Sequence, residues 1–181
     1  FLVVPMQYQI DGEVQELDLN ADDMASKTHQ FYEKLLAGSV ATTFQVNQQS
    51  WIDHVEPLCR AGQDVLILAF SSGLSGTYLA ARGAVQELSK RYPERKLYAL
   101  DTLSASLGEG FFVHHVMKFR DEGHGIEETL AWAKANVMRS IHWFTVSDLH
   151  FLRRGGRVSA TSAYFGTVLK IKPILNVDPK G

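Results

Sequence analysis

The stretch from Asp64 to Tyr78, DVLILAFSSGLSGTY, constrains the fold more than any other part of the chain. Val65 to Phe70 are six consecutive apolar residues with no polar alternation, which is typical of a β-strand covered on both faces. Such strands occur in parallel sheets that are flanked by helices. The sequence therefore predicts an α/β fold in which this strand is central.

A turn rich in serine and glycine, Ser71 to Gly76, follows this strand and leads into a helical pattern. Apolar residues recur behind it at helical spacing, at Ala81, Ala84, Val85 and Leu88. Unpaired amides and the positive end of the helix dipole favour an anion at this point, and Ser75 and Thr77 can add hydroxyl donors. A carboxylate or a phosphate is the predicted ligand, and an ordinary helix N-cap is the alternative role of Ser75.

Strand and helix patterns alternate through most of the chain. The predicted elements are, in order, strands over 2–10 and 13–19 joined at Asp11-Gly12, a helix from Met24 to Gly38, a strand over 40–45, a helix that buries Trp51, Val55, Leu58 and Cys59 and ends at Gly62, the central strand, its helix, a strand over 96–100, and helices over 107–120 and 126–141. The first of these helices is expected to place Met24, Thr28, Phe31 and Leu35 on its inward face. This alternation predicts a mostly parallel sheet that binds its ligand beyond the carboxyl ends of the strands, where Ser75 lies.

The pattern changes after Ile141, which predicts a domain boundary there. Residues 1–141 form the first predicted domain, and residues 142–181 begin a second one with a strand over 143–146, a Gly155-Gly156 break, a helix of small residues and a strand over 168–177. The chain opens on Phe1 within an apolar strand and ends in a turn at Gly181. The expectation is therefore an α/β chain with two domains, which begins after its natural start and ends at a turn whose next strand is absent.

Composition excludes several classes of function. A chain of 181 residues with 45% hydrophobic content can bury a real core, and a net charge of -2 argues against a general nucleic-acid binder. The single cysteine, Cys59, rules out an internal disulfide and favours the reducing cytoplasm. No apolar run approaches the roughly 20 residues of a membrane span. His114 and His115 are adjacent and would point apart on a helix, so no metal site is expected there.

Several stretches together resemble the DegV family of bacterial fatty-acid-binding proteins. They are SSGLSGTY at 71–78, Thr42-Thr43-Phe44-Gln45 against a threonine, serine, glutamine, proline motif, and DLHFLRRGGRVS at 148–159 leading into LKIKPIL at 169–175. Their order and spacing fit, and the resemblance covers nearly all of the chain.

The resemblance implies a carrier with no chemistry and no cofactor of its own. One long-chain fatty acid would lie in a buried tunnel, and a separate fatty acid kinase would phosphorylate it to the acyl phosphate used in phospholipid synthesis. By motif position, Thr43 and Ser75 would bind the carboxylate through their hydroxyls, and Gly76 and Phe44 would complete the fatty-acid-binding residues. Arg157 would lie near the tunnel mouth or the kinase surface.

The chain departs from the family pattern at two positions of the first motif. Phe44 stands where the family usually has serine, and Val46 stands where it usually has proline, which implies a more apolar mouth. The resemblance also implies that the family's first strand and its Asp-Ser-Thr turn precede Phe1, and that the second domain continues beyond the chain. A family histidine near the carboxylate belongs to that later region, so none of the histidines of this chain is expected to take over its role.

Two other functions use the same turn. A serine hydrolase would use Ser75 as its nucleophile, but the nucleophile elbow needs a glycine two places after the serine, where Thr77 stands. It also needs a histidine base that the sequence does not place. A phosphate or nucleotide site is the third hypothesis, and it lacks the P-loop lysine. The sequence therefore favours the carrier over the hydrolase, and the hydrolase over the nucleotide site.

Overall fold

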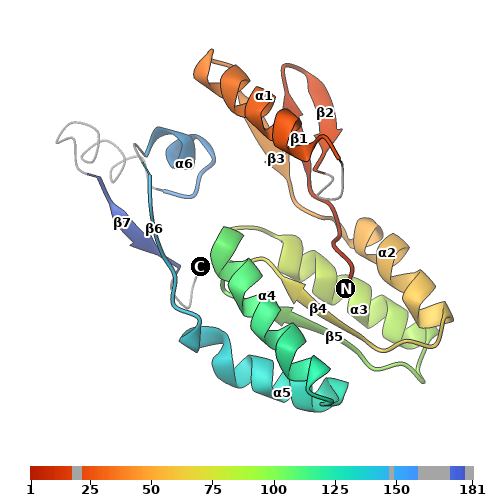
Figure 1. Ribbon diagram of the computed structural model, residues 1–181. Helices are drawn as coiled ribbons and strands as arrows, with labels where there is room; N and C mark the ends of the chain where they lie inside the picture. The colour runs from red at the N-terminus through yellow and green to blue at the C-terminus, as the bar shows by residue number, and fades with distance from the viewer. Residues whose placement is uncertain (18–21, 147–148, 159–171, 178–181) are drawn as a thin grey trace.

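The computed structural model describes residues 1–17, 22–146, 149–158 and 172–177 (Figure 1). Its elements are β1 (Gln7–Ile10), β2 (Glu13–Glu16), α1 (Met24–Leu36), β3 (Ala41–Phe44), α2 (Gln48–Arg60), β4 (Val65–Ala69), α3 (Thr77–Arg91), β5 (Leu97–Asp101), α4 (Ser106–Asp121), α5 (Ile126–Asn136), β6 (Trp143–Thr145), α6 (His150–Arg154) and β7 (Ile174–Asn176). The predicted α/β class is confirmed. In the described ranges the parallel sheet is small, because it consists of β4 and β5.

The strand β4 is covered on both faces, as its uninterrupted apolar sequence predicts. It pairs in parallel with β5, and Val65 lies opposite Leu97. Ile67 and Ala69 belong to a core shared with α2 and α3, whereas Leu66 and Leu68 pack against a second core built from α4 and α5. Figure 1 shows these two helix pairs on either side of the sheet. The two covered faces are thus confirmed, whereas the central place predicted for the strand is not, because β5 is its one sheet neighbour in the described ranges.

The helices that flank β4 follow the predicted periodicity in part. On α3, Ala81, Ala84 and Leu88 are buried, as expected. On α2 the buried residues are Trp51, Ile52, Val55 and Cys59. Ile52 was not predicted to be buried, and Leu58, which was, is only partly buried. Gly62 has a φ of +78°, the left-handed conformation that ends a helix at a glycine.

The first part of the chain forms an antiparallel sheet in the order β2-β1-β3. The Asp11-Gly12 hairpin is confirmed, but both of its strands are shorter than predicted. The pairing of β1 with β3 was not predicted, because α1 separates them in the sequence. The rings of Tyr8 and Phe31 meet edge to face 5.2 Å apart, which places α1 against this sheet. Of the predicted inward face of α1, Phe31 and Leu35 are only partly buried, and the rest is exposed.

The helix predicted over 126–141 ends earlier. α5 stops at Asn136, a 3₁₀ turn occupies Val137–Arg139, and Ile141 is 72% exposed. The Asn136 side-chain amide donates to the carbonyl of Trp132 at 2.8 Å, one of the local bonds by which asparagine competes with regular helix. The apolar period that continues to Ile141 therefore does not continue the helix.

The last described segments form the antiparallel pair β6 and β7, with Phe144 opposite Leu175. α6 is followed by the predicted Gly155-Gly156 break, where Gly156 has a φ of +76°. The predicted helix of small residues and the first part of the predicted strand over 168–177 lie outside the described residues. No helix in the described ranges is both long enough and apolar enough to cross a membrane.

The residues before β6 are held against α4 by a close approach at Gly108. A side-chain carbon on Gly108 would lie 2.7 Å from Cδ2 of the His142 ring. We expect Gly108→Ala to lower the free energy of unfolding by about 1–3 kcal/mol, because the ring must be displaced from a packed position. Urea denaturation measures the change.

Gly110 is the matched control on the same helix. An added carbon there meets no atom within 4 Å, so Gly110→Ala is expected to stabilise the protein by about 0.5–1 kcal/mol, the usual gain from replacing a helical glycine. If the two variants changed the free energy of unfolding alike, the His142 ring would not pack against Gly108 of α4.

Candidate functional site

The turn after β4 is organised by hydrogen bonds to Ser71 and Ser75. The amides of Leu74 and Ser75 both donate to the Ser71 carbonyl at 3.1 Å. The Thr77 amide donates to Ser75 Oγ at 3.3 Å, and the two hydroxyls lie 2.9 Å apart. Gly76 is the N-cap residue of α3, so Ser75 is not the N-cap itself, although its hydroxyl accepts the first amide of the helix. Ser75 therefore has a structural role, and when the Thr77 hydroxyl donates to its oxygen, the Ser75 proton remains for one further bond.

The start of α3 keeps donors free. Within the described ranges, the amides of Gly76, Tyr78 and Leu79 make no hydrogen bond to the protein. Free amides at the N-terminus of a helix, together with its dipole, attract an anion. The α3 N-terminus, with the Ser75 hydroxyl beside it, is therefore chemically suited to a carboxylate.

The turn after β5 is fastened to the turn after β4. The Ser71 amide donates to the Ser104 carbonyl at 3.0 Å. One carboxylate oxygen of Asp101 accepts the amides of Ser72, at 3.2 Å, and Leu103, at 3.1 Å. The sequence places Ser104 and Asp101 at the end of β5, but only the structure shows that they support the Ser71 turn. The sequence feature that could have indicated this contact is their position at the carboxyl end of a neighbouring parallel strand.

The predicted threonine motif reaches this turn through Gln45. A side-chain carbon on Gly76 would overlap the Gln45 amide oxygen and lie 2.9 Å from its Cδ, so only glycine fits here while Gln45 keeps its position. Thr43 is two residues before Gln45, about 7 Å along an extended strand. Thr43 and Ser75 are not hydrogen-bonded to each other. The structure thus brings Gln45 of the motif to the turn, a contact that sequence reasoning missed.

The other residues of the motif separate into surface and core. Thr43 lies opposite Tyr8 in the β1–β3 register, so both side chains are on the sheet face that carries α1. Phe44 is exposed, and Val46 is buried in the core between β4, α2 and α3. The valine at the usual proline position is therefore a packing residue.

Arg157 reaches the same turn from the far end of the described chain. Its Nε donates to the Leu74 carbonyl at 3.1 Å, and one of its terminal nitrogens donates to the Gly155 carbonyl. Arg157 of the glycine-glycine-arginine stretch and Gln45 of the threonine motif are far apart in sequence, but both contact the serine turn at residues 74–76. The guanidinium adds a positive charge beside the free amides of α3.

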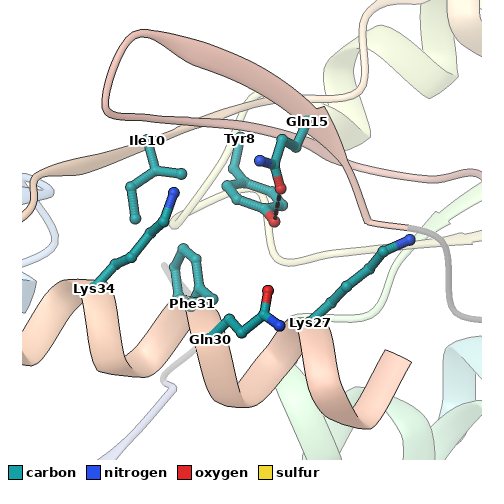
Figure 2. Close-up of a pocket in the computed structure, with 7 residues that line it drawn as sticks. All are labelled: Tyr8, Ile10, Gln15, Lys27, Gln30, Phe31 and Lys34. Carbon is teal, nitrogen blue, oxygen red and sulfur yellow. Dashed lines mark hydrogen bonds between the residues drawn. The ribbon is translucent and has the colours of Figure 1, made fainter. Parts of the chain in front are cut away.

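A small hollow lies elsewhere, between α1 and the β1–β2 hairpin. Figure 2 shows Lys27, Phe31 and Lys34 of α1 facing Tyr8 and Ile10, with Tyr8 bonded to Gln15 at 2.6 Å. Its volume is about 50 Å³. Ligand cavities for drug-sized molecules occupy about 300–1,000 Å³, so this hollow is too small for a long acyl chain.

No three metal-ligating side chains gather in the part of the chain that the structure describes. His115 lies on the surface of α4 with Nδ1 2.9 Å from the Phe111 carbonyl, and its ring meets that of His114 edge to face. These two histidines make local contacts on their own helix.

Comparisons with known proteins place the chain in a family. The family model described as "Uncharacterised protein, DegV family" matches residues 1–181. A DegV domain-containing protein from Clostridium perfringens is 40% identical over 151 residues, which cover 83% of this chain and 52% of the relative. The chain thus spans about half the length of the curated relatives that it matches.

Solved structures with a similar fold include members of the same family. A DegV family protein from Thermus thermophilus, whose structure is described as showing fatty acid binding, superposes with a TM-score of 0.79 at 29% identity, over 97% of this chain and 59% of that one. The Streptococcus pneumoniae fatty acid kinase B3 protein, solved with linoleic acid, superposes with a TM-score of 0.83 over 98% and 60% of the two chains. Its 19% identity shows the fold alone. This chain belongs to the DegV family.

Proposed function

We propose that the protein binds one long-chain fatty acid and presents it to a separate fatty acid kinase, which forms the acyl phosphate. The carboxylate is held at the start of α3 by the hydroxyls of Thr43 and Ser75 and by the Gly76 amide. The acyl chain runs past Phe44 into a buried tunnel between a first domain of residues 1–141 and a second domain that begins at residue 142. The protein is a cytoplasmic carrier without catalysis or cofactor.

The convergence of three sequence motifs on one helix start carries this proposal. Gln45 packs on Gly76 from one side, and Arg157 bonds to the Leu74 carbonyl from the other. Between them lie free amides and the Ser75 hydroxyl. A carboxylate transferred from water needs such donors, because burying it without partners would be prohibitively costly.

Similar proteins support the ligand class. The Thermus thermophilus relative is described as a fatty-acid-binding DegV protein, and a DegV protein from Bacillus subtilis, 27% identical, is described in the same way. The kinase partner rests on the resemblance of the serine turn and the Gly-Gly-Arg stretch to the family motifs. Arg157 is the residue of this chain that we assign to the tunnel mouth or the kinase surface.

The serine hydrolase is the second candidate, and the geometry favours it less. The Ser75 hydroxyl is paired with Thr77, and in the described ranges no histidine nitrogen bonds to it. A nucleophilic serine needs a base within hydrogen-bond reach. The carrier needs only donors, which the turn supplies.

We expect Ser75→Ala and Thr43→Ala each to weaken fatty acid binding by about 1–3 kcal/mol, because each removes a hydrogen bond to a charged group. Titration calorimetry with oleate on delipidated protein measures the change, and mass spectrometry of the untreated protein identifies a co-purified acid. Ser72→Ala and Thr42→Ala, at exposed neighbouring hydroxyls, are the controls.

An ester hydrolysis assay separates the two candidates. Retained fatty acid without turnover supports the carrier. Hydrolysis that disappears in Ser75→Ala would replace the carrier with the hydrolase, and failure of the parent chain to bind oleate would refute the carrier function of this chain.

A further inference from the structure

Two serine hydroxyls are buried without a hydrogen-bond partner at the carboxyl ends of β4 and β5. Ser71 is 0% exposed and Ser104 is 1% exposed. The Oγ atoms of both have no partner within the described chain. Buried hydroxyls are nearly always bonded, and leaving one unbonded costs about 1–3 kcal/mol. Two unbonded buried hydroxyls at neighbouring strand ends therefore indicate either a ligand that bonds to them or a structural role.

Both serines belong to the unit that supports the start of α3. The Ser71 carbonyl holds the amides of Leu74 and Ser75, and the Ser71 amide bonds to the Ser104 carbonyl. The bond from the Ser75 amide to the Ser71 carbonyl makes these two residues the ends of one tight turn. The buried Ser71 hydroxyl therefore belongs to the turn that carries Ser75.

The local charges are compatible with an anion above these hydroxyls. The carboxylate of Asp101, which ends β5, already accepts the amides of Ser72 and Leu103. The free amides of Gly76, Tyr78 and Leu79 and the guanidinium of Arg157 supply positive potential on the same side.

We propose that the hydroxyls of Ser71 and Ser104 are further donors to the ligand's carboxylate, forming the floor of the head-group site whose rim is Ser75. This assignment rests on the proposed fatty acid binding. Among the described residues both hydroxyls are buried and unbonded, and the carboxylate supplies the missing acceptor. The site thus gives up stability in the free state in return for affinity, as buried polar groups at functional sites do.

The proposal predicts opposite effects on stability and on binding. Ser71→Ala removes an unbonded buried hydroxyl, so the melting temperature of the delipidated protein should rise by about 2–4 °C. The same change should weaken oleate binding about tenfold or more, while methyl oleate, which has no carboxylate, should bind as tightly as it does to the parent. Ser104→Ala should behave in the same direction, and Ser72→Ala, at the exposed serine of the same turn, should change neither quantity.

The outcomes distinguish this inference from the function on which it rests. If Ser75→Ala loses oleate affinity but Ser71→Ala and Ser104→Ala keep it, the proposed carrier function is retained, and the proposal that the Ser71 and Ser104 hydroxyls bind the carboxylate is refuted. A lower melting temperature with unchanged affinity would assign them to a structural water and overturn the proposal. Equal losses for oleate and methyl oleate would also overturn it, because the head group would not be involved. If oleate binds neither to the parent nor to any variant, the carrier function itself fails.

Discussion

In a variant with Leu88 replaced by alanine, the free energy of unfolding is expected to fall by about 2–5 kcal/mol. Leu88 is 0% exposed in the core where α3 packs on β4, β5 and α2. Truncating a buried leucine loses the burial of its side chain and leaves a cavity, which together cost this amount. The shift of the urea midpoint at an unchanged m-value measures it.

Leu79 on the same helix is the matched control. It is 56% exposed, so Leu79→Ala should change the free energy of unfolding by no more than about 0.5 kcal/mol. Leu88 also lies 13 residues from Ser75, about 20 Å along a helix, so oleate affinity below the unfolding transition should be unchanged. Equal destabilisation by both leucine variants would mean that α3 does not pack through the face carrying Leu88.

The strand, turn and helix from Val65 to Arg91 could be predicted because each signal is local. Six apolar residues without alternation require two covered faces, and a Ser/Gly turn followed by small residues at helical spacing requires a helix start. Both features are present in β4 and α3. Local chemistry also predicted the Asp11-Gly12 hairpin and the stop at Gly62.

Contacts between distant residues could not be predicted in this way. β3 pairs with β1 across the whole of α1, Gln45 packs on Gly76, and Arg157 bonds to the Leu74 carbonyl, 83 residues away. None of these partners is encoded by the spacing of residues along one element. Motif matching assigned binding roles to Thr43, Ser75 and Arg157 and included Gln45 in a motif without indicating its contact, because it compares residue types rather than contacts.

The floor of the proposed head-group site shows the same limit. The sequence marks Ser71 and Ser104 as ordinary turn residues, since serine favours turns and caps. Their burial, and the lack of a partner for either hydroxyl in the described part of the chain, arise only when the turns after β4 and β5 are bonded to each other. A polar residue that breaks the rule of bonded burial is visible in three dimensions alone, and it is at such residues that function is expected.

Glu109, in the first turn of α4, gives the second large effect, a dependence of stability on pH. The helix dipole favours a charged carboxylate at this position, but burial outweighs it and raises the pKa of the Glu109 carboxyl to about 7, from 4.5. In the described ranges it has no ion-pair partner. The folded protein therefore keeps a proton on Glu109 at pH values where the unfolded chain has released it.

The sign follows from proton binding. Below pH 4.5 both states carry the proton and Glu109 imposes no penalty. As the pH rises from 4.5 through 7, the folded state loses stability on the order of 3 kcal/mol.

Glu109→Gln keeps a neutral side chain of the same shape, so it should match the parent at pH 4.5 and be more stable by about this amount at pH 8. Urea denaturation at several pH values measures the difference between variant and parent. Glu122→Gln, at the exposed C-cap of the same helix, is the control for replacing a glutamate outside the buried first turn. If the difference for Glu109→Gln were constant across this range, the carboxyl would be charged in the folded protein, and α4 would begin in contact with water rather than against the protein.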